Sequence, residues 1–266
     1  MTDFDEHSSA PGAAPEPAAE DAIQPPAPLR VPRPWRPGAA LALAVSVLGI
    51  NSVASLGVRR ILDLELADTL TALLVAACFA VAYAIPLGVV WLVSVSQGIG
   101  FADFVALRRP RAVSTREWLA SAVTGAVVAR AFALAFGVVV TLLSLKLPGM
   151  DADPLSLFPG GLTSDLVLVA VVVLLAPFAE EVVFRGVLLS SLGARWGTVT
   201  AVIASSLVFA SVHVNAFLLL PILIASLFFG LLYVRFESLW PAVLCHAVFN
   251  GVAVVLAIAL RGTGVL

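Results

Sequence analysis

Charged side chains are scarce in this sequence. They make up 12% of 266 residues, whereas hydrophobic residues make up 61% and the mean hydropathy is +1.05. A soluble domain carries about 25% charged residues, which lets it cover its surface with polar groups. This chain cannot do so. A soluble globular protein is therefore excluded, and lipid must be the solvent for much of the chain.

Cysteine and clustered basic residues are also nearly absent. The two cysteines, Cys78 and Cys245, each lie in an apolar run, which argues against a disulfide framework and for packing as small hydrophobic residues. The formal net charge is −2 and no basic stripe occurs, so we expect no nucleic-acid partner. A glycine-rich loop that could cradle a phosphate is missing as well.

The sequence does contain a series of long apolar runs. Runs of about 20 apolar residues can cross the hydrocarbon core as helices, and these runs lack the alternation of barrel strands. We therefore predict an all-α fold, a polytopic transmembrane helical bundle of about seven spans, with kinks at Pro86 and Pro177. The predicted spans are 39–58, 69–96, 118–143, 165–192, 198–213, 217–234 and 239–259.

Three regions follow from this pattern. Residues 1–37 are rich in proline and hold six of the seventeen acidic residues, which predicts a disordered cytoplasmic tail. Residues 38–160 are the N-terminal transmembrane helices, and 161–266 hold the candidate catalytic helices. A cytoplasmic N-terminus puts nine basic residues inside and four outside, as the positive-inside rule favours, with the C-terminus on the opposite side. Fourteen of the fifteen basic residues are arginine, a bias that favours a bacterial plasma membrane.

Ionisable residues inside the predicted spans mark candidate functional sites, because each costs a few kcal/mol in hydrocarbon. Six such residues occur, and five of them lie between positions 180 and 246. They are Arg130, Glu180, Glu181, Arg185, His213 and His246.

Two adjacent acids share one helical segment with an arginine. Glu181 and Arg185 are one turn apart and predict an ion pair, whereas Glu180 points about 100° away from Glu181. A second acid adds desolvation cost without a structural return, so Glu180 is predicted to face a functional surface. The alternative is an ion pair at the membrane edge with Glu180 as a bystander.

Two histidines complete the pattern. Phe209 lies one turn before His213, and His246 shares a helix face with Asn250, so both members of the second pair can donate hydrogen bonds. Counted from the turn near Trp196, Glu180 and His213 each lie about 25 Å along their helices. His246 lies only about 14 Å along its own helix, which predicts an offset of about 10 Å. Each pair could instead serve as interhelical packing.

A carboxylate and an imidazole that share a water can activate it as a base. A second imidazole with a carboxamide can stabilise the oxyanion that forms when this water attacks an amide. Glu180, His213 and His246 also match a zinc ligand set with water as the fourth ligand. The predicted depth offset of His246 disfavours tight coordination. We therefore favour no cofactor, with zinc as the alternative.

At these residues the sequence resembles the CPBP (CAAX protease and bacteriocin-processing, or Abi) family of intramembrane proteases. Its three motifs match Glu180-Glu181-x-x-x-Arg185, Phe209-x-x-x-His213 and His246-x-x-x-Asn250 in order. The resemblance covers roughly 165–259. It implies an endopeptidase in which Glu180 and His213 activate water, His246 and Asn250 form the oxyanion site, and Glu181, Arg185 and Phe209 give structural support. Family members differ in metal dependence.

Three functions remain open at this point. The first is hydrolysis of a peptide or membrane-protein substrate within the lipid bilayer. The second is a non-catalytic immunity or maturation factor, in which the polar cluster only joins helices. The third is a proton-coupled transporter, which is the least favoured because the charges sit in one half of the chain and no inverted repeat is evident.

Overall fold

The computed structural model describes residues 35–110, 113–151, 156–158 and 160–261. Most of the predicted tail, 1–37, lies outside these residues. The described residues are helical and contain no strand. The helices are α1 (Pro37–Leu62), α2 (Asp68–Ser96), α3 (Phe101–Phe104), α4 (Thr115–Leu142), α5 (Leu162–Leu168), η1 (Val169–Leu175), α6 (Ala176–Glu181), η2 (Val182–Leu189), α7 (Ser190–Trp196), α8 (Thr198–Ser211), α9 (Ala216–Phe236) and α10 (Leu239–Leu260).

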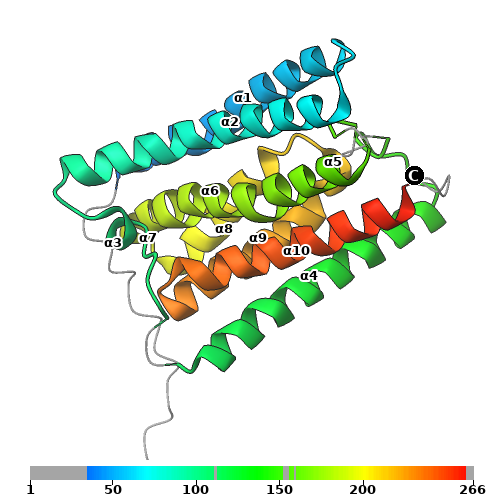
Figure 1. Cartoon of the computed structure of the whole chain (residues 1–266). Helices are drawn as coiled ribbons and strands as arrows, with labels where there is room; N and C mark the ends of the chain where they lie inside the picture. Colours follow the sequence, from blue (N-terminus) through cyan, green and yellow to red (C-terminus); the bar gives the residue numbers. More distant parts are fainter. Residues whose placement is uncertain (1–34, 111–112, 152–155, 159, 262–266) are drawn as a thin grey trace, which may run out of the picture.

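The predicted helical membrane fold is confirmed. Within the described residues, six helical stretches are long and apolar enough to span a membrane, and α8 is a shorter apolar helix of 14 residues. Elements α5 through α7 join end to end into one stretch, Leu162–Trp196, of 35 residues. This stretch is longer than the predicted span 165–192. Figure 1 shows it running through the middle of the bundle, with α1 and α2 above and α10 and α4 below.

The loops lie alternately at the two ends of the bundle. At one end, which we call the Ser238 face, Leu239 N–H donates to Ala106 O at 2.9 Å and so joins the start of α10 to the loop after α3. At the other end, the Asn215 face, Phe217 N–H donates to Pro148 O at 3.2 Å and joins the α8–α9 turn to the loop after α4. Figure 1 shows α10 ending at this second face. Because α1 starts at the Ser238 face, its N-terminus and the end of α10 lie at opposite ends. Which end is cytoplasmic stays a prediction.

Proline and π-helical turns shape the central stretch. Both η1 and η2 are π-helical, and Pro177 lies in the first turn of α6, immediately after η1. A proline lacks an N–H group, so it cannot close a helical hydrogen bond, and wider π turns often accompany functional sites. Kinks were predicted at both prolines. At Pro177 the helix is irregular, whereas α2 continues through Pro86 as a single helix.

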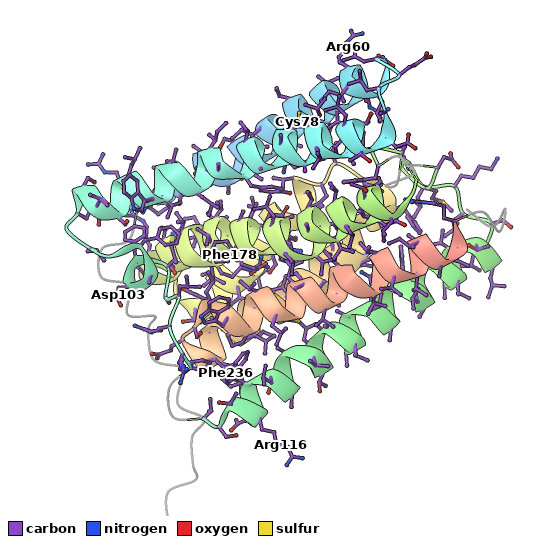
Figure 2. The ribbon with its side chains drawn as sticks, in the orientation of Figure 1. Arg60, Cys78, Asp103, Arg116, Phe178 and Phe236 are labelled. Carbon is purple, nitrogen blue, oxygen red and sulfur yellow. The ribbon has the colours of Figure 1, made fainter. Side chains whose placement is uncertain are left out.

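The outer surface is apolar, as lipid contact requires. Val53 is 69% exposed, Leu142 is 77% exposed, and most of the exposed large side chains are aliphatic. Side chains of this kind in such numbers are rare on soluble monomers. The bundle interior, in contrast, contains charged groups, because the side chains of Glu181 and Arg185 are completely buried. Figure 2 shows how side chains fill the space between the helices. The chain is an integral membrane protein.

Candidate active site

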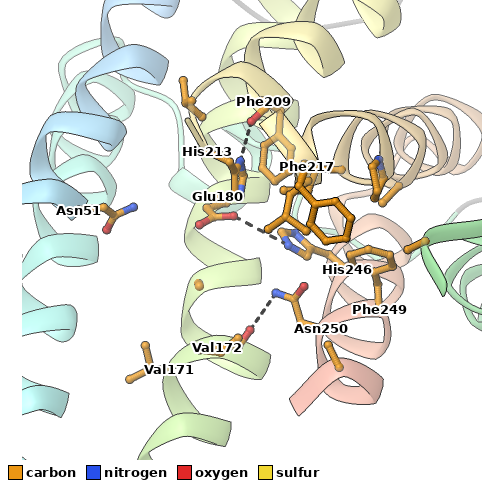
Figure 3. Close-up of a pocket in the computed structure, with 18 of the residues that line it drawn as sticks. Asn51, Val171, Val172, Glu180, Phe209, His213, Phe217, His246, Phe249 and Asn250 are labelled. Carbon is orange, nitrogen blue, oxygen red and sulfur yellow. Dashed lines mark hydrogen bonds and ion pairs between the residues drawn. The ribbon is translucent and has the colours of Figure 1, made fainter. Parts of the chain in front are cut away.

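One large cavity, with a volume of about 1350 Å³, lies inside the bundle. Four predicted site residues from three segments line it: Glu180 on α6, His213 after α8, and both His246 and Asn250 on α10. Figure 3 shows their side chains around a common space. The structure therefore brings together groups that lie up to 70 positions apart in the sequence. The walls beyond them are mostly aliphatic and aromatic, which leaves this polar cluster in apolar surroundings.

Glu180 lies near the end of α6, and its two carboxylate oxygens have different surroundings. The Tyr83 hydroxyl, from α2, donates to Oε1 at 3.1 Å. The second oxygen, Oε2, lies 3.9 Å from Nε2 of His246, a distance too long for a direct hydrogen bond. Tyr83 thus fixes one oxygen of Glu180 and leaves the other free to take a proton.

Glu181 points away from the cavity and makes the predicted ion pair. Its Oε1 accepts from Arg185 Nη1 at 2.8 Å, and both side chains are fully buried. Arg185 Nη2 also donates to the carbonyl and the hydroxyl of Ser226 on α9, at 2.9 and 2.6 Å. Such additional hydrogen bonds offset part of the desolvation cost of a buried pair, while Glu181 Oε2 and Arg185 Nε have no partner among the described residues. The pair therefore fixes the central stretch against α9.

His246 has a partner that the sequence did not reveal. Its Nδ1 lies 2.8 Å from the same Glu181 Oε1. That oxygen already accepts from Arg185, so the imidazole is the donor and Nδ1 carries a proton. The ring also stacks on Phe229, with centroids 4.5 Å apart and planes at 16°. These contacts orient the ring so that Nε2 faces Glu180. Glu181 consequently positions His246 in addition to holding Arg185.

His213 lies just beyond the end of α8, in a tight turn. Its backbone N–H donates to Ala210 O at 3.3 Å, which leaves the Phe209 carbonyl to accept from the His213 ring at 2.8 Å. A carbonyl can only accept, so Nδ1 is protonated and Nε2 of a neutral ring keeps its lone pair. Phe209 also packs on this ring, with centroids 4.9 Å apart. His213 is therefore held in the tautomer that a base requires.

Asn250 depends on the irregular helix opposite it. Its Nδ2 donates to Val172 O at 3.0 Å. In a π-helix the N–H five residues later would bond to this carbonyl, but that residue is Pro177, which has no N–H group. The proline thus leaves a carbonyl that fixes the carboxamide. The second Nδ2 proton stays available for a ligand in the cavity.

The predicted depth offset of about 10 Å for His246 is wrong. Nε2 of His246 and Oε2 of Glu180 are 3.9 Å apart. The predicted offset assumed that the α7–α8 turn at Trp196 and the α9–α10 turn at Ser238 lie at the same depth. Ser238 is fully buried, however, whereas Trp196 is 53% exposed. The α9–α10 turn is thus recessed into the bundle. In addition, η2 lies between Glu180 and Trp196, and its wider turns advance less per residue than an α-helix.

Several cavity residues escaped the sequence analysis because nothing in their spacing marks them. Tyr83 and Asn51 come from α2 and α1, and Phe229 comes from α9. The remaining intramembrane charge, Arg130, also lines the cavity, where its Nε donates to Phe249 O at 3.1 Å and its guanidinium lies 3.8 Å from the Phe249 ring centre. Arg130 thus joins α4 to α10 beside Asn250.

Metal binding was the open alternative for this cluster. Within the part of the chain that the structure describes, no three His, Cys, Asp or Glu side chains are grouped closely enough to hold a metal ion. The alternative set of Glu180, His213 and His246 is therefore not assembled as a zinc site in this arrangement. A three-ligand zinc site needs all its donors at about 2.0–2.2 Å from one point.

The comparison with protein families points to the same region. Residues 162–252 match the family described as type II CAAX prenyl endopeptidase Rce1-like. This stretch contains Glu180, His213, His246 and Asn250, and the match supports the resemblance to the CPBP family. It indicates an intramembrane endopeptidase of the CAAX type in general. A search of curated proteins found no match, and neither did a search of solved structures.

Proposed function

We propose that this protein is an intramembrane endopeptidase that hydrolyses a peptide bond with water activated by Glu180 and His213. The observation that carries the proposal is the convergence of four family-region residues on one cavity inside the bundle. Both residues line this space, where an ionised Glu180 carboxylate and the Nε2 lone pair of a neutral His213 ring can serve as proton acceptors. Either can take a proton from a bound water as its oxygen attacks the carbonyl carbon.

The oxyanion site lies on α10. Attack produces a tetrahedral intermediate with a negative oxygen, which needs donors already in place. Asn250 offers its second Nδ2 proton. His246 already donates from Nδ1 to Glu181, so its Nε2 can act as a second donor only when the ring is an imidazolium. When the C–N bond breaks, the proton taken by Glu180 or His213 passes to the leaving amine.

The cavity walls suit a substrate that comes from the membrane. Leu56 on α1 and both Leu134 and Val138 on α4 line the cavity with aliphatic side chains that are 51–64% exposed. The cavity therefore offers an apolar wall to a substrate. A hydrophobic peptide or a segment of a membrane protein fits this wall. The matching family is described as a CAAX prenyl endopeptidase, so a prenylated peptide is a narrower case.

Peptide termini in native membranes test the proposal even while the substrate is unidentified. Membranes from cells that produce the wild-type protein should contain new peptide ends, detected by mass spectrometry, that are absent with Glu180→Gln. Glu117→Gln is the matched control, because Glu117 is exposed and pairs with Arg235 at the bundle end. An S-prenylated peptide and its unmodified form are tested in parallel. Identical termini with the wild type and Glu180→Gln would favour the non-catalytic maturation factor instead.

A further inference from the structure

The cavity extends from the site toward one end of the bundle only. On α1 its lining residues fall within 47–59 and on α4 within 130–142, which are the halves of these helices nearer the Asn215 face. Toward the Ser238 face the interior is filled, and Val183, Leu188 and Leu189 are fully buried there. Any water that reaches Glu180 through the bundle therefore has open space on the side of the Asn215 face.

A polar stripe on α1 follows this open space. Asn51, Ser55 and Arg59 are spaced four residues apart, so they share one helix face, and all three line the cavity. Such side chains are costly against lipid and usually face a protein interior or a water-filled space. Arg59 is in the last turn of α1, at the Asn215 face, and Asn51 is two turns deeper. The stripe thus leads from the bundle end toward the site.

Asn51 ends this stripe with an unpaired oxygen. Its Oδ1 is buried and has no hydrogen-bond partner among the described residues. A buried amide oxygen without a partner costs about 1–3 kcal/mol, and a water in a polar cavity can remove that cost. Figure 3 shows Asn51 reaching from α1 toward the space beside Glu180. Tyr83, which lines the same cavity, donates to that carboxylate.

We propose that the water consumed at Glu180 enters from the Asn215 face along Arg59, Ser55 and Asn51, and that Asn51 binds it beside Tyr83 and Glu180. Water entry is the limiting problem for hydrolysis inside a bilayer, and the stripe supplies hydrogen-bond partners from the bundle end to the carboxylate. That this water is consumed in catalysis rests on the proposed function. Its hydration and direction can be measured without a substrate.

Cysteine modification in sealed vesicles is the test. A charged, membrane-impermeant methanethiosulfonate reacts with a thiolate, which forms only where water reaches the sulfur. Ser55→Cys reports the stripe. Val53→Cys is the matched control, because it lies at nearly the same depth on the lipid-facing side of α1 and is 69% exposed. The background carries Cys78→Ala, and Cys245 is retained because it is fully buried.

Two further variants mark the two sides of the membrane, whichever way the protein is inserted. Leu145→Cys lies in the loop at the Asn215 face and Arg195→Cys at the end of α7, at the Ser238 face. Ser55→Cys should react about tenfold or more faster than Val53→Cys, in the vesicles in which Leu145→Cys reacts. Equal rates at positions 53 and 55, or reaction only in the vesicles in which Arg195→Cys reacts, would overturn the path. Either result leaves the test of hydrolysis with Glu180→Gln unaffected.

Discussion

The two halves of this protein contribute to the cavity in different ways. The C-terminal half supplies ionisable groups on α6, after α8 and on α10, and their spacing forms recognisable motifs. The N-terminal helices supply the stripe of Asn51, Ser55 and Arg59 on α1, Tyr83 on α2 and Arg130 on α4, and these residues form no motif that spacing alone reveals. Only the first set lies in the family match, 162–252. Reacting groups can thus be predicted from local sequence patterns, whereas the groups that hydrate and orient them depend on packing.

The largest expected effect lies in the C-terminal half, at Glu180. Glu180→Gln keeps the size of the side chain but removes the proton acceptor. Loss of a general base lowers the rate by about 10²–10⁴-fold. Hydrolysis should therefore disappear while the unfolding temperature in detergent stays near that of the wild type. If the Glu180→Gln protein is active, the Glu180 carboxylate is not the general base.

Its neighbour should behave in the opposite way. Glu181→Ala leaves Arg185 charged and unpaired in a fully buried position, and breaking a buried pair costs about 3–5 kcal/mol. We expect lower abundance in the membrane and a lower midpoint in denaturant unfolding. Should Glu181→Ala fold like the wild type while Glu180→Gln unfolds, the roles of the two acids are reversed.

A smaller effect is expected in the N-terminal half. Tyr83→Phe removes the hydrogen bond to Glu180 Oε1, and a bond to a charged group is worth about 1.5–3 kcal/mol. We expect kcat to fall about tenfold or more, with unchanged KM. The other tyrosine is the control: Tyr233→Phe removes a bond to Ser190 of 2.9 Å in the packed core. If both variants lower kcat equally, Tyr83 has no special relation to Glu180.

The smallest expected effect is that of a chelator. If Glu180 and His213 act on water directly, purified protein should keep its activity in chelator and contain less than one zinc per chain. Metal analysis beside the activity assay measures both. Stoichiometric zinc that is lost with activity, and restores it on addition, would establish the metal alternative and leave the endopeptidase proposal in place.

Much of the fold could be predicted because membrane helices carry their signal in composition and length. The predicted start of the last span, 239, is the start of α10, and its predicted end, 259, lies one residue before the end of that helix. The ion pair of Glu181 with Arg185 was equally accessible, since it needs only helical periodicity. Signals of this kind are local.

The remaining features required three-dimensional packing. The depth of His246 in the bundle depends on the recessed α9–α10 turn, which is hydrogen-bonded to Ala106. The hydrogen bond between His246 and Glu181 joins two residues that are 65 positions apart in the sequence. No periodicity reports either one. Tyr83 looks like an ordinary aromatic residue in an apolar span until α2 is placed against α6. The link from Pro177 through Val172 to Asn250 likewise needs the π-helical turns.

The proposed role of Glu180 is to activate a water whose oxygen enters the new carboxyl group. It is tested most directly by hydrolysis in water enriched in ¹⁸O, with a peptide identified from the membrane termini. The wild-type protein should place one ¹⁸O atom in the new C-terminal carboxylate of each product, and Glu180→Gln should yield no labelled product. Cleavage without label in the wild type would rule out hydrolysis, and equal labelled product from Glu180→Gln would rule out this role of Glu180.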